Sequence, residues 1–361
     1  MTDVDNGLGI FFTGLPARLS VQYAVRAEAC GFRSAWFPEI TFADSFGPAT
    51  AAALETQRIS LGTGVVGIWS RSSVTMALQA ATLQQLSDER LLLGLGVQAR
   101  GYVSGWHGQD YERPVTAMRE FVTILRQILS GELVTFAGDI FSVKNFQLQM
   151  EPPKQPVRIY IAANGPKMIQ LAGEHADGMI GYFHSVEYVR DVVMPNLEKG
   201  AQRAGRDVSE IDITVGFPSI VTRDDSGIEL VKGQVMMFAT ALDSAPAYGE
   251  SVAAAGFGDI AEEIRAHVAA GDLRAAVQAV PDAMADALTL SGSAEHVRAR
   301  IDAYRSAGLT GVMLNPSPPG GWFPLYEGHF PTDAELPPFD FPGFLEVVDT
   351  TLDLLGASVP S

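Results

Sequence analysis

Few side chains in this sequence could take part in chemistry, and they stand far apart. Glu39 follows a short apolar segment and a proline, His107 lies between a tryptophan and a glycine, and His184 follows another apolar segment. A carboxylate or an imidazole in such a place could hold or transfer a proton. The alternative for Glu39 is a helix cap or an ion pair with an arginine such as Arg71, and for both histidines it is packing or capping.

A second kind of candidate is a backbone site for an anion. Residues 164–167 (Asn-Gly-Pro-Lys) join an apolar segment to the start of a predicted helix, where free N–H groups and the helix dipole favour a phosphate. Lys167 could contact that phosphate or lie in solvent. The Gly-Leu-Gly sequence at 94–96 permits close approach to the backbone. Ordinary turns containing glycine are the alternative for both segments.

The elements that must position these residues alternate between short apolar strands and helices. The stretch from Ser60 to Val97 contains an apolar run at 61–68, a predicted helix over 73–86 and a second apolar run at 91–97. Apolar residues recur at helical spacing in the middle segment, and Ser72 or Ser73 can cap it. The strands lack polar alternation, which is typical of parallel strands buried on both faces.

Eight such strand and helix units predict a (β/α)8 TIM barrel formed by residues 1–361. The rival fold is an open, doubly wound sheet, but no Gly-x-Gly-x-x-Gly follows the first strand. Two insertions are expected: a pair of short strands (133–136 and 140–143) within 131–150, and a helical subdomain at 225–290 after the seventh strand. The expected strands are 8–14, 34–39, 61–68, 91–97, 158–164, 178–183, 211–221 and 312–315.

In a barrel of this kind the site lies at the carboxyl ends of the strands. The lining is then expected to comprise Phe12, Thr13, Glu39, 64–68, 96–99, 163–167, Phe183, His184, Phe217 and Asn315. This set lacks paired carboxylates, a Ser/His/Asp arrangement and metal-ligand spacing. It therefore disfavours a hydrolase or a metal enzyme, and no metal is expected. A flat, mostly apolar slot suits a planar aromatic cofactor that carries the chemistry.

The overall charge and the cysteine content limit the partners. The net charge of −17 disfavours binding to nucleic acid or to an acidic membrane surface. Cys30 is the single cysteine, so no intramolecular disulfide can form. No secretory signal or membrane-spanning apolar run is recognised, and a cytoplasmic location is expected.

Several motifs resemble those of the bacterial luciferase-like flavin and deazaflavin superfamily. They are Leu61-Gly-Thr-Gly-Val-Val-Gly-Ile68 with Arg71, Ala81-Thr-Leu-Gln-Gln-Leu-Ser87 with Arg90, Leu93-Gly-Leu-Gly96, Gly105-Trp-His-Gly108, Arg119-Glu-Phe121, Ile161-Ala-Ala-Asn-Gly-Pro-Lys-Met168 and Leu171-Ala-Gly-Glu-His-Ala-Asp-Gly178. They occur in this order between residues 8 and 185. The Trp-His-Gly and Gly-Pro-Lys blocks are most similar to the coenzyme F420-dependent reductases, including the methylenetetrahydromethanopterin reductase group.

The resemblance implies particular roles for residues of this chain. It implies a cis peptide bond at Gly64–Val65 behind the deazaflavin ring and backbone contacts from Gly96 and Val97. The cofactor tail would lie on Ala162, Ala163, Asn164, Gly165 and Pro166, with Lys167 beside them. Glu39 and Ile40 replace the family's Asp-His pair, and Ala99 stands where related sugar-phosphate dehydrogenases carry a catalytic glutamate, so that subgroup's acid–base mechanism is not expected.

These features predict an F420-dependent oxidoreductase that exchanges a hydride between C5 of the deazaflavin and a small organic substrate. Glu39 and His107 are the candidate catalytic residues, and Phe12, Thr13 and His184 are expected in the substrate pocket. The resemblance also implies a homodimer. An FMN-dependent two-component monooxygenase is one alternative, and a catalytically silent flavin-binding barrel is the other. Substrate specificity is expected to be encoded in 225–290.

Overall fold

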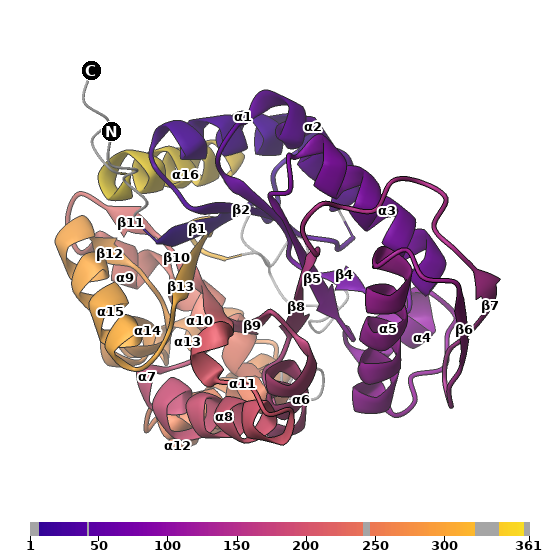
Figure 1. Cartoon of the computed structure of the whole chain (residues 1–361). Helices are drawn as coiled ribbons and strands as arrows, with labels where there is room; N and C mark the ends of the chain where they lie inside the picture. Colours follow the sequence, from indigo (N-terminus) through magenta and orange to yellow (C-terminus); the bar gives the residue numbers. More distant parts are fainter. Residues whose placement is uncertain (1–6, 42, 241–245, 322–338, 357–361) are drawn as a thin grey trace. The chain divides into compact units, whose positions relative to one another are not determined.

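The structure is a computed structural model that describes residues 7–41, 43–240, 246–321 and 339–356. Its parallel strands form a closed barrel with helices on the outside, which confirms the predicted TIM fold (Figure 1). The eight barrel strands are β1 (Leu8–Phe11), β2 (Ser34–Phe37), β3 (Ser60–Thr63), β5 (Leu91–Gly96), β8 (Arg158–Ala162), β9 (Gly178–Tyr182), β10 (Asp212–Ser219) and β13 (Gly311–Pro316). A short strand, β4 (Val66–Gly67), extends the line of β3.

Parallel pairing runs from strand to strand around the barrel. Leu61 of β3 lies opposite Ala35 of β2 on one side and Leu91 of β5 on the other. These strands are almost entirely buried, as expected where side chains pack on both faces of a parallel sheet. Gly62 is required within β3 because a Cβ there would collide with the ring of Trp36.

The contacts between residues divide the chain into two compact units. The first unit comprises Phe11–Ile180 and Asn196–Asp212, and the second comprises the remainder. Helices α1, α2, α3 and α5 pack in sequence in the first unit (Figure 1). The helices of this unit are α1 (Ala17–Ala29), α2 (Phe46–Glu55), α3 (Ser73–Leu86), α4 (Arg100–Trp106), α5 (Pro114–Leu129) and α6 (Pro166–His175), with most of α8 (Met194–Arg203) and the 3-10 turn Val208–Glu210.

Helix α3 begins and ends at the residues predicted from its apolar spacing. Ser72 caps it, because the Ser72 hydroxyl oxygen accepts a hydrogen bond from the Thr75 N–H at 3.1 Å. After this helix, Arg90 bonds the backbone oxygens of Ala53, Thr56, Ile59 and Ser87 at 2.6–3.1 Å. Arg90 thereby ties α2, β3 and the end of α3 to the start of β5.

An antiparallel hairpin interrupts the alternation, as predicted, although its strands begin later than expected. It consists of β6 (Val134–Ala137) and β7 (Ser142–Phe146). The buried carboxylate of Glu120 on α5 accepts hydrogen bonds from the N–H groups of Asp139, Ile140 and Phe141 at 2.8–2.9 Å. The hairpin turn is thus fixed to α5 by one side chain.

The second unit carries a helical segment between two very short strands. Val221 of β11 (Val221–Thr222) pairs with Gly292 of β12 (Gly292–Ser293), which brings the two ends of the segment together. An apolar core built around Val235, Met236 and Met284 holds its helices. The helices of the second unit are α7 (Val186–Tyr188) with the π-turn Val189–Val193, α9 (Ser226–Leu230), α10 (Lys232–Thr240), α11 (Pro246–Ala254), α12 (Gly258–Ala269), α13 (Leu273–Gln278), α14 (Asp282–Leu288), α15 (Ala294–Ser306) and α16 (Phe341–Leu355).

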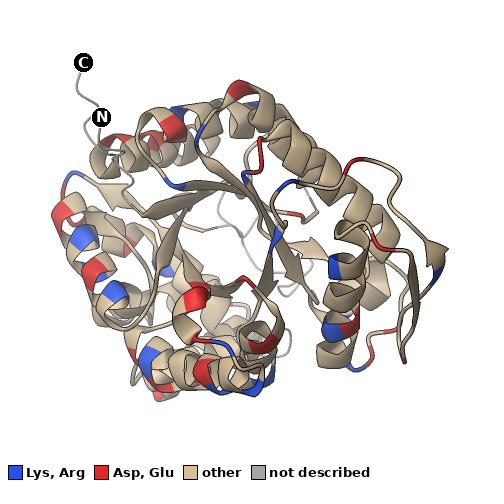
Figure 2. Ribbon diagram, in the orientation of Figure 1, with Lys and Arg blue, Asp and Glu red and all other residues tan. Residues whose placement is uncertain are grey.

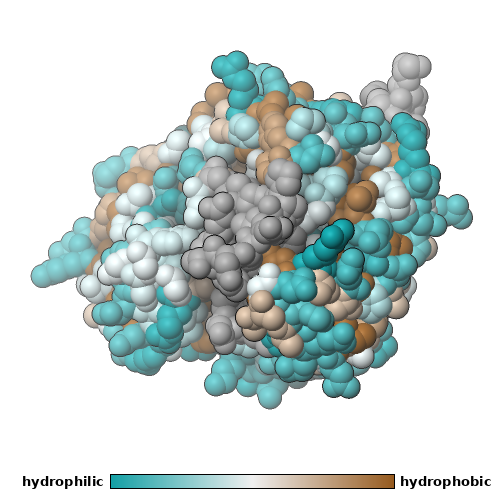
Figure 3. Space-filling model, turned by 180° about the vertical axis from the view of Figure 1, so that it is seen from behind, coloured by the Kyte–Doolittle hydropathy of each residue, from teal (hydrophilic) through white to brown (hydrophobic). Residues whose placement is uncertain are grey.

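Charged residues gather on the helices and loops, whereas the barrel strands are mostly uncharged (Figure 2). The face shown in Figure 3 is largely hydrophilic, with small hydrophobic areas between. Within the described ranges, no helix is both long enough and apolar enough to cross a membrane. In the same ranges, no group of three His, Cys, Asp or Glu side chains could hold a metal ion.

Candidate functional site

The peptide bond between Gly64 and Val65, directly after β3, is cis, as the sequence resemblance implied. Neighbouring glycines leave room for the side chains on both sides of it. A Cβ at Gly64 would lie 2.6 Å from Cε2 of Phe11, and a Cβ at Gly96 would lie 2.5 Å from Cγ2 of Val65. The Gly-Leu-Gly sequence of β5 therefore accommodates Val65, and Gly64 accommodates the ring of Phe11.

Glu39 is bound to three donors just after β2. Its Oε2 lies 2.5 Å from Nη2 of Arg71, and its Oε1 accepts hydrogen bonds from the Ser70 hydroxyl at 3.2 Å and from the Gly67 N–H at 3.4 Å. The Glu39 and Arg71 side chains are 14% and 17% exposed. Of the alternatives that the sequence left open, the structure shows the ion pair with Arg71. Its carboxylate anchors the segment that follows β4.

Trp69, in the same segment, packs with Tyr111 and Phe141 in an aromatic cluster that we call the Trp69 wall. Its ring lies 6.2 Å from the ring of Tyr111 and 5.5 Å from that of Phe141, which the hairpin supplies. The Tyr111 hydroxyl donates a hydrogen bond to the backbone oxygen of Gln98 at 3.4 Å. Sequence reasoning placed residue 98 in the lining but missed Trp69, because no periodicity marks a side chain in the turn after β4.

Three polar atoms around this wall are buried and have no hydrogen-bond partner among the described residues: Nε1 of Trp69, Nη1 of Arg71 and Oε1 of Gln98. Buried polar atoms are normally paired, so such atoms point to a missing partner. A planar ring with polar atoms on its edge could supply that partner. These unpaired atoms fit the polar edge of a flavin or deazaflavin ring.

The expected tail site is a strand-to-helix turn, as predicted. Gly165 precedes α6, and no atom lies within 4 Å of the position that a Cβ would occupy there. Pro166 and Lys167 are exposed, Ala162 and Asn164 are partly buried, and Ala163 is buried. The helix N-terminus thus opens on free space, which suits an anion. Ala163 can contribute only its backbone to such a ligand.

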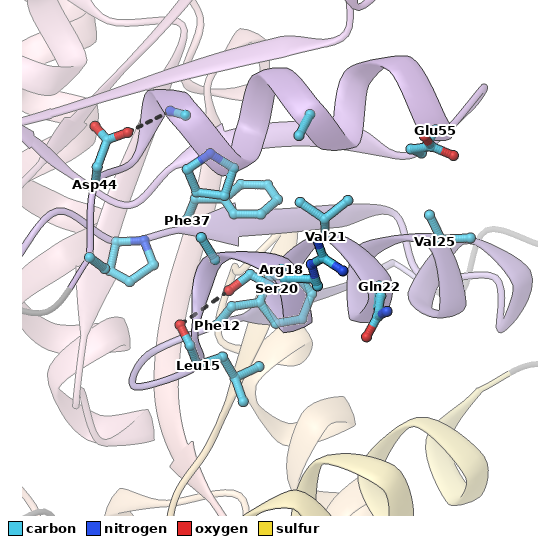
Figure 4. A pocket seen from close by; sticks show the side chains of 16 residues that line it. Phe12, Leu15, Arg18, Ser20, Val21, Gln22, Val25, Phe37, Asp44 and Glu55 are labelled. Atoms are coloured by element: carbon cyan, nitrogen blue, oxygen red, sulfur yellow. Dashed lines mark hydrogen bonds between the residues drawn. The ribbon is translucent and has the colours of Figure 1, made fainter.

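Phe12 lines a cavity of about 900 Å³ between α1 and α2 (Figure 4). Phe12 and Phe37 form part of the lining, with ring centroids 5.5 Å apart, and Arg18 and Glu55 also line the cavity. The neighbouring side chain, that of Phe11, is the one beside Gly64. Phe11 lies beside Gly64 and Phe12 beside the cavity, because successive strand residues face opposite sides. The place of Phe12 in the substrate pocket stays a prediction. Thr13 is partly buried.

The two histidines differ in their surroundings. His107 ends α4 and is partly exposed. His184, in the second unit, is fully buried, and neither ring nitrogen has a partner among the described residues. Burial lowers the pKa of His184 to about 3, so its imidazole is neutral near pH 7. Its ring packs 4.9 Å from that of Tyr188, and its contact with a substrate stays a prediction.

Another polar pair lies at strand ends of the second unit. Nδ2 of Asn315 donates a hydrogen bond to the Tyr182 hydroxyl at 2.7 Å, and Oδ1 of Asn315 is buried without a partner among the described residues. Gly216 makes room for the Tyr182 ring, since a Cβ there would lie 2.8 Å from Cδ2 of Tyr182. The sequence placed Asn315 in the lining but gave no sign of its partner.

The fold is that of a TIM-barrel protein, and buried, unpaired polar atoms gather at neighbouring strand ends. The sequence profile of the luciferase-like monooxygenase family matches residues 11–311. The chain therefore belongs to this family, in agreement with the resemblance noted in its motifs.

Two relatives and one solved structure illustrate the similarity. The chain is 29% identical over 306 residues to a 5,10-methylenetetrahydromethanopterin reductase of Methanolobus tindarius, which covers 82% of this chain and 90% of the relative. It is 31% identical over 218 residues to an F420-dependent glucose-6-phosphate dehydrogenase of Amycolatopsis mediterranei, covering 56% and 65%. The structure of the coenzyme F420-dependent tetrahydromethanopterin reductase from Methanopyrus kandleri superposes with a TM-score of 0.77 and 25% identity, covering 86% of this chain and 92% of that one.

Proposed function

We propose that this chain is a coenzyme F420-dependent oxidoreductase acting on a small organic substrate. The observation that carries the proposal is the group of buried, unpaired polar atoms of Trp69, Arg71 and Gln98 at neighbouring strand ends. Similarity to F420-dependent relatives supports the choice of cofactor. When bound, F420 would supply a carbon that accepts or donates a hydride; the protein's part is to hold and orient it.

Different residues of this chain would bind the ring and the tail of the cofactor. Gly64 and Val65 would support one face of the ring, and Gly96 and Val97 would contact it through their backbone. The open turn before α6 would take the anionic tail, since nothing occupies the space at Gly165. Its residues are Ala162, Ala163, Asn164, Gly165, Pro166 and Lys167.

Glu39 and His107 are assigned different parts in this proposal. Because Glu39 is held by three donors, it serves as a positioning residue that fixes Arg71 and Gly67. His107, partly exposed after β5 and α4, is the group proposed to exchange a proton with the substrate. Thr13 is retained as a proposed substrate contact.

A homodimer and a cytoplasmic location complete the proposal. Leu54 of α2 is 64% exposed and Leu78 of α3 is 42% exposed, on helices that pack side by side. Large exposed apolar side chains on adjacent helices favour association with another chain. The single cysteine motivates the proposed location, because reducing compartments do not favour disulfides.

An FMN-dependent monooxygenase is the second candidate, because the family is described as luciferase-like monooxygenase. Enzyme assays separate the two. Reduced F420 would be mixed anaerobically with enones and imines, and oxidised F420 with secondary alcohols, while the absorbance of oxidised F420 is followed. Substrate-dependent turnover is expected in at least one direction. Transfer of one oxygen atom from O2 to the substrate in the presence of reduced FMN, with no F420 turnover, would instead establish the monooxygenase.

A further inference from the structure

The three unpaired atoms of Trp69, Arg71 and Gln98 belong to one connected neighbourhood around Gly67. The amide of Gln98 lies over Gly67, where a Cβ would be 2.5 Å from its Cδ. Glu39 accepts a hydrogen bond from the Gly67 N–H and also holds Arg71. Trp69 is two residues further along the same turn.

Arg71 and Trp69 are fixed by other contacts, so their unpaired atoms are not a result of mobility. Arg71 is bound to Glu39 through Nη2, and its guanidinium stacks 5.5 Å from the ring of Phe46. Trp69 is held by the aromatic rings of Tyr111 and Phe141. Buried and fixed groups with unsatisfied hydrogen bonds are prepared for a ligand that supplies the missing partners.

The types of these atoms identify the ligand chemistry. The indole Nε1 of Trp69 and Nη1 of Arg71 are N–H donors, and Oε1 of Gln98 is an acceptor. Their complement is a group with two acceptors and one donor. An imide edge, in which an N–H lies between two carbonyl groups, has this composition. The pyrimidinedione ring of a flavin or deazaflavin presents such an edge.

We infer that Trp69, Arg71 and Gln98 recognise the imide edge of the cofactor ring. The Trp69 and Arg71 N–H groups donate to its two carbonyl oxygens, and Oε1 of Gln98 accepts a hydrogen bond from its N–H. This inference rests on the proposed function and adds three specificity-determining side chains to a site otherwise built from backbone. These side chains form only hydrogen bonds with the cofactor and no covalent bond.

The test is a binding titration of the full chain with F420 and with its N3-methyl derivative, followed by cofactor fluorescence. Trp69→Phe keeps an aromatic ring but removes the N–H, and Gln98→Met keeps the length of the side chain but removes the acceptor. Each substitution is expected to weaken F420 binding about three- to tenfold, the effect of losing one hydrogen bond. Methylation at N3 is expected to weaken binding to the wild type but to cause little further loss in Gln98→Met.

The controls are a substitution at an exposed tryptophan and a measurement of thermal unfolding. Trp106→Phe, on an exposed ring stacked 4.0 Å from Tyr102, should bind F420 like the wild type. Thermal unfolding shows that each variant is folded. Wild-type affinity in both Trp69→Phe and Gln98→Met, or equal weakening by N3-methylation in wild type and Gln98→Met, would overturn this inference and leave the proposed function standing. A wild type that binds neither F420 nor FMN would overturn both.

Discussion

The carboxylate of Glu39 shows how neighbouring residues decide what one side chain can do. From sequence it was a candidate to transfer a proton or to pair with Arg71, and no pattern chose between them. In the structure its oxygens face a guanidinium, a hydroxyl and a backbone N–H. Its role in the proposed enzyme is therefore to hold Arg71 and the turn after β4 in place.

Glu39 and Arg71 should be energetically coupled. Glu39→Gln and Arg71→Met are each expected to lower the free energy of unfolding by about 1–3 kcal/mol, because each leaves a largely buried polar partner unsatisfied. The double variant should lose clearly less than the sum, as measured by urea denaturation in a double-mutant cycle. Additive losses would show that the ion pair contributes nothing of its own.

Gly165 tests the proposed tail site. Gly165→Trp should fold like the wild type, since no atom lies within 4 Å of the Cβ position, but its indole would fill the anion site. F420 binding should weaken by at least about tenfold, equivalent to roughly 1.4 kcal/mol. Gly165→Ala is the matched control and should retain affinity. Unchanged F420 affinity in the tryptophan variant, with native circular dichroism, would show that the cofactor tail does not bind at this turn.

The direction of side chains at the strand ends could not be predicted from the sequence, for a physical reason. The family resemblance located the Gly64–Val65 bond, and the strand-to-helix pattern with its Gly-Pro pair located the 164–167 turn. Neither fixed the direction of side chains at strand ends. The structure places Phe11 beside Gly64 and Phe12 in the cavity between α1 and α2, and His184 is fully buried. The direction of a side chain at a strand end depends on the residue at which the strand stops, and apolar periodicity does not define that residue closely.

At the scale of elements, the hairpin and α5 depend on Glu120. Burial raises the pKa of the Glu120 carboxyl, but hydrogen bonds from the N–H groups of Phe141, Ile140 and Asp139 more than offset this, and the net pKa is lowered. The carboxylate thus stabilises the fold above its unfolded pKa of about 4.5. This contribution is lost as the pH falls below that value and through the lowered folded pKa.

Glu120→Gln should therefore release the hairpin turn and disturb the Trp69 wall through Phe141. The free energy of unfolding at pH 7 should fall by about 1.5–3 kcal/mol, the range for hydrogen bonds to a charged group. The difference from wild type should shrink as the pH is lowered below about 4.5. Urea denaturation across pH, with near-ultraviolet circular dichroism for Trp69, measures both effects. Glu132→Gln, at an exposed position, is the control; an equal loss there would contradict the role of Glu120.

Most elements could be predicted because their patterns are strong. The apolar spacing and Ser72 cap of α3, and Pro114 at the start of α5, set boundaries that the structure reproduces. The hairpin strands were misplaced by a few residues because β7 is largely exposed and lacks apolar alternation. The link between Glu120 and the hairpin joins residues about twenty positions apart and could not be read from local sequence.

At the scale of the whole molecule, barrel closure follows from the number of strand and helix units, which the sequence revealed. The division of the chain into two compact units was not predicted, because it depends on contacts between distant segments. The identity of a partner chain is likewise not contained in any one element. Exposed apolar side chains on α2 and α3 provide the testable feature.

The proposed homodimer predicts that the protein sediments as a dimer at micromolar concentration. Leu54→Glu should shift it toward monomer, because a charge would be buried in the apolar contact. Leu133→Glu, at a similarly exposed leucine in the hairpin region, should leave the dimer intact. Sedimentation velocity distinguishes these outcomes. A wild type that sediments only as monomer, or a dimer equally affected by both substitutions, would contradict the proposed interface.

The most direct test of the central claim is a titration of the purified wild-type chain with F420 and, separately, with FMN, followed by cofactor fluorescence. The account predicts saturable F420 binding that is much tighter than FMN binding. Tight binding of FMN with weak binding of F420 would contradict it and favour the monooxygenase. Binding of neither cofactor would show that the strand ends around Gly64–Val65 do not bind a flavin or a deazaflavin in this protein.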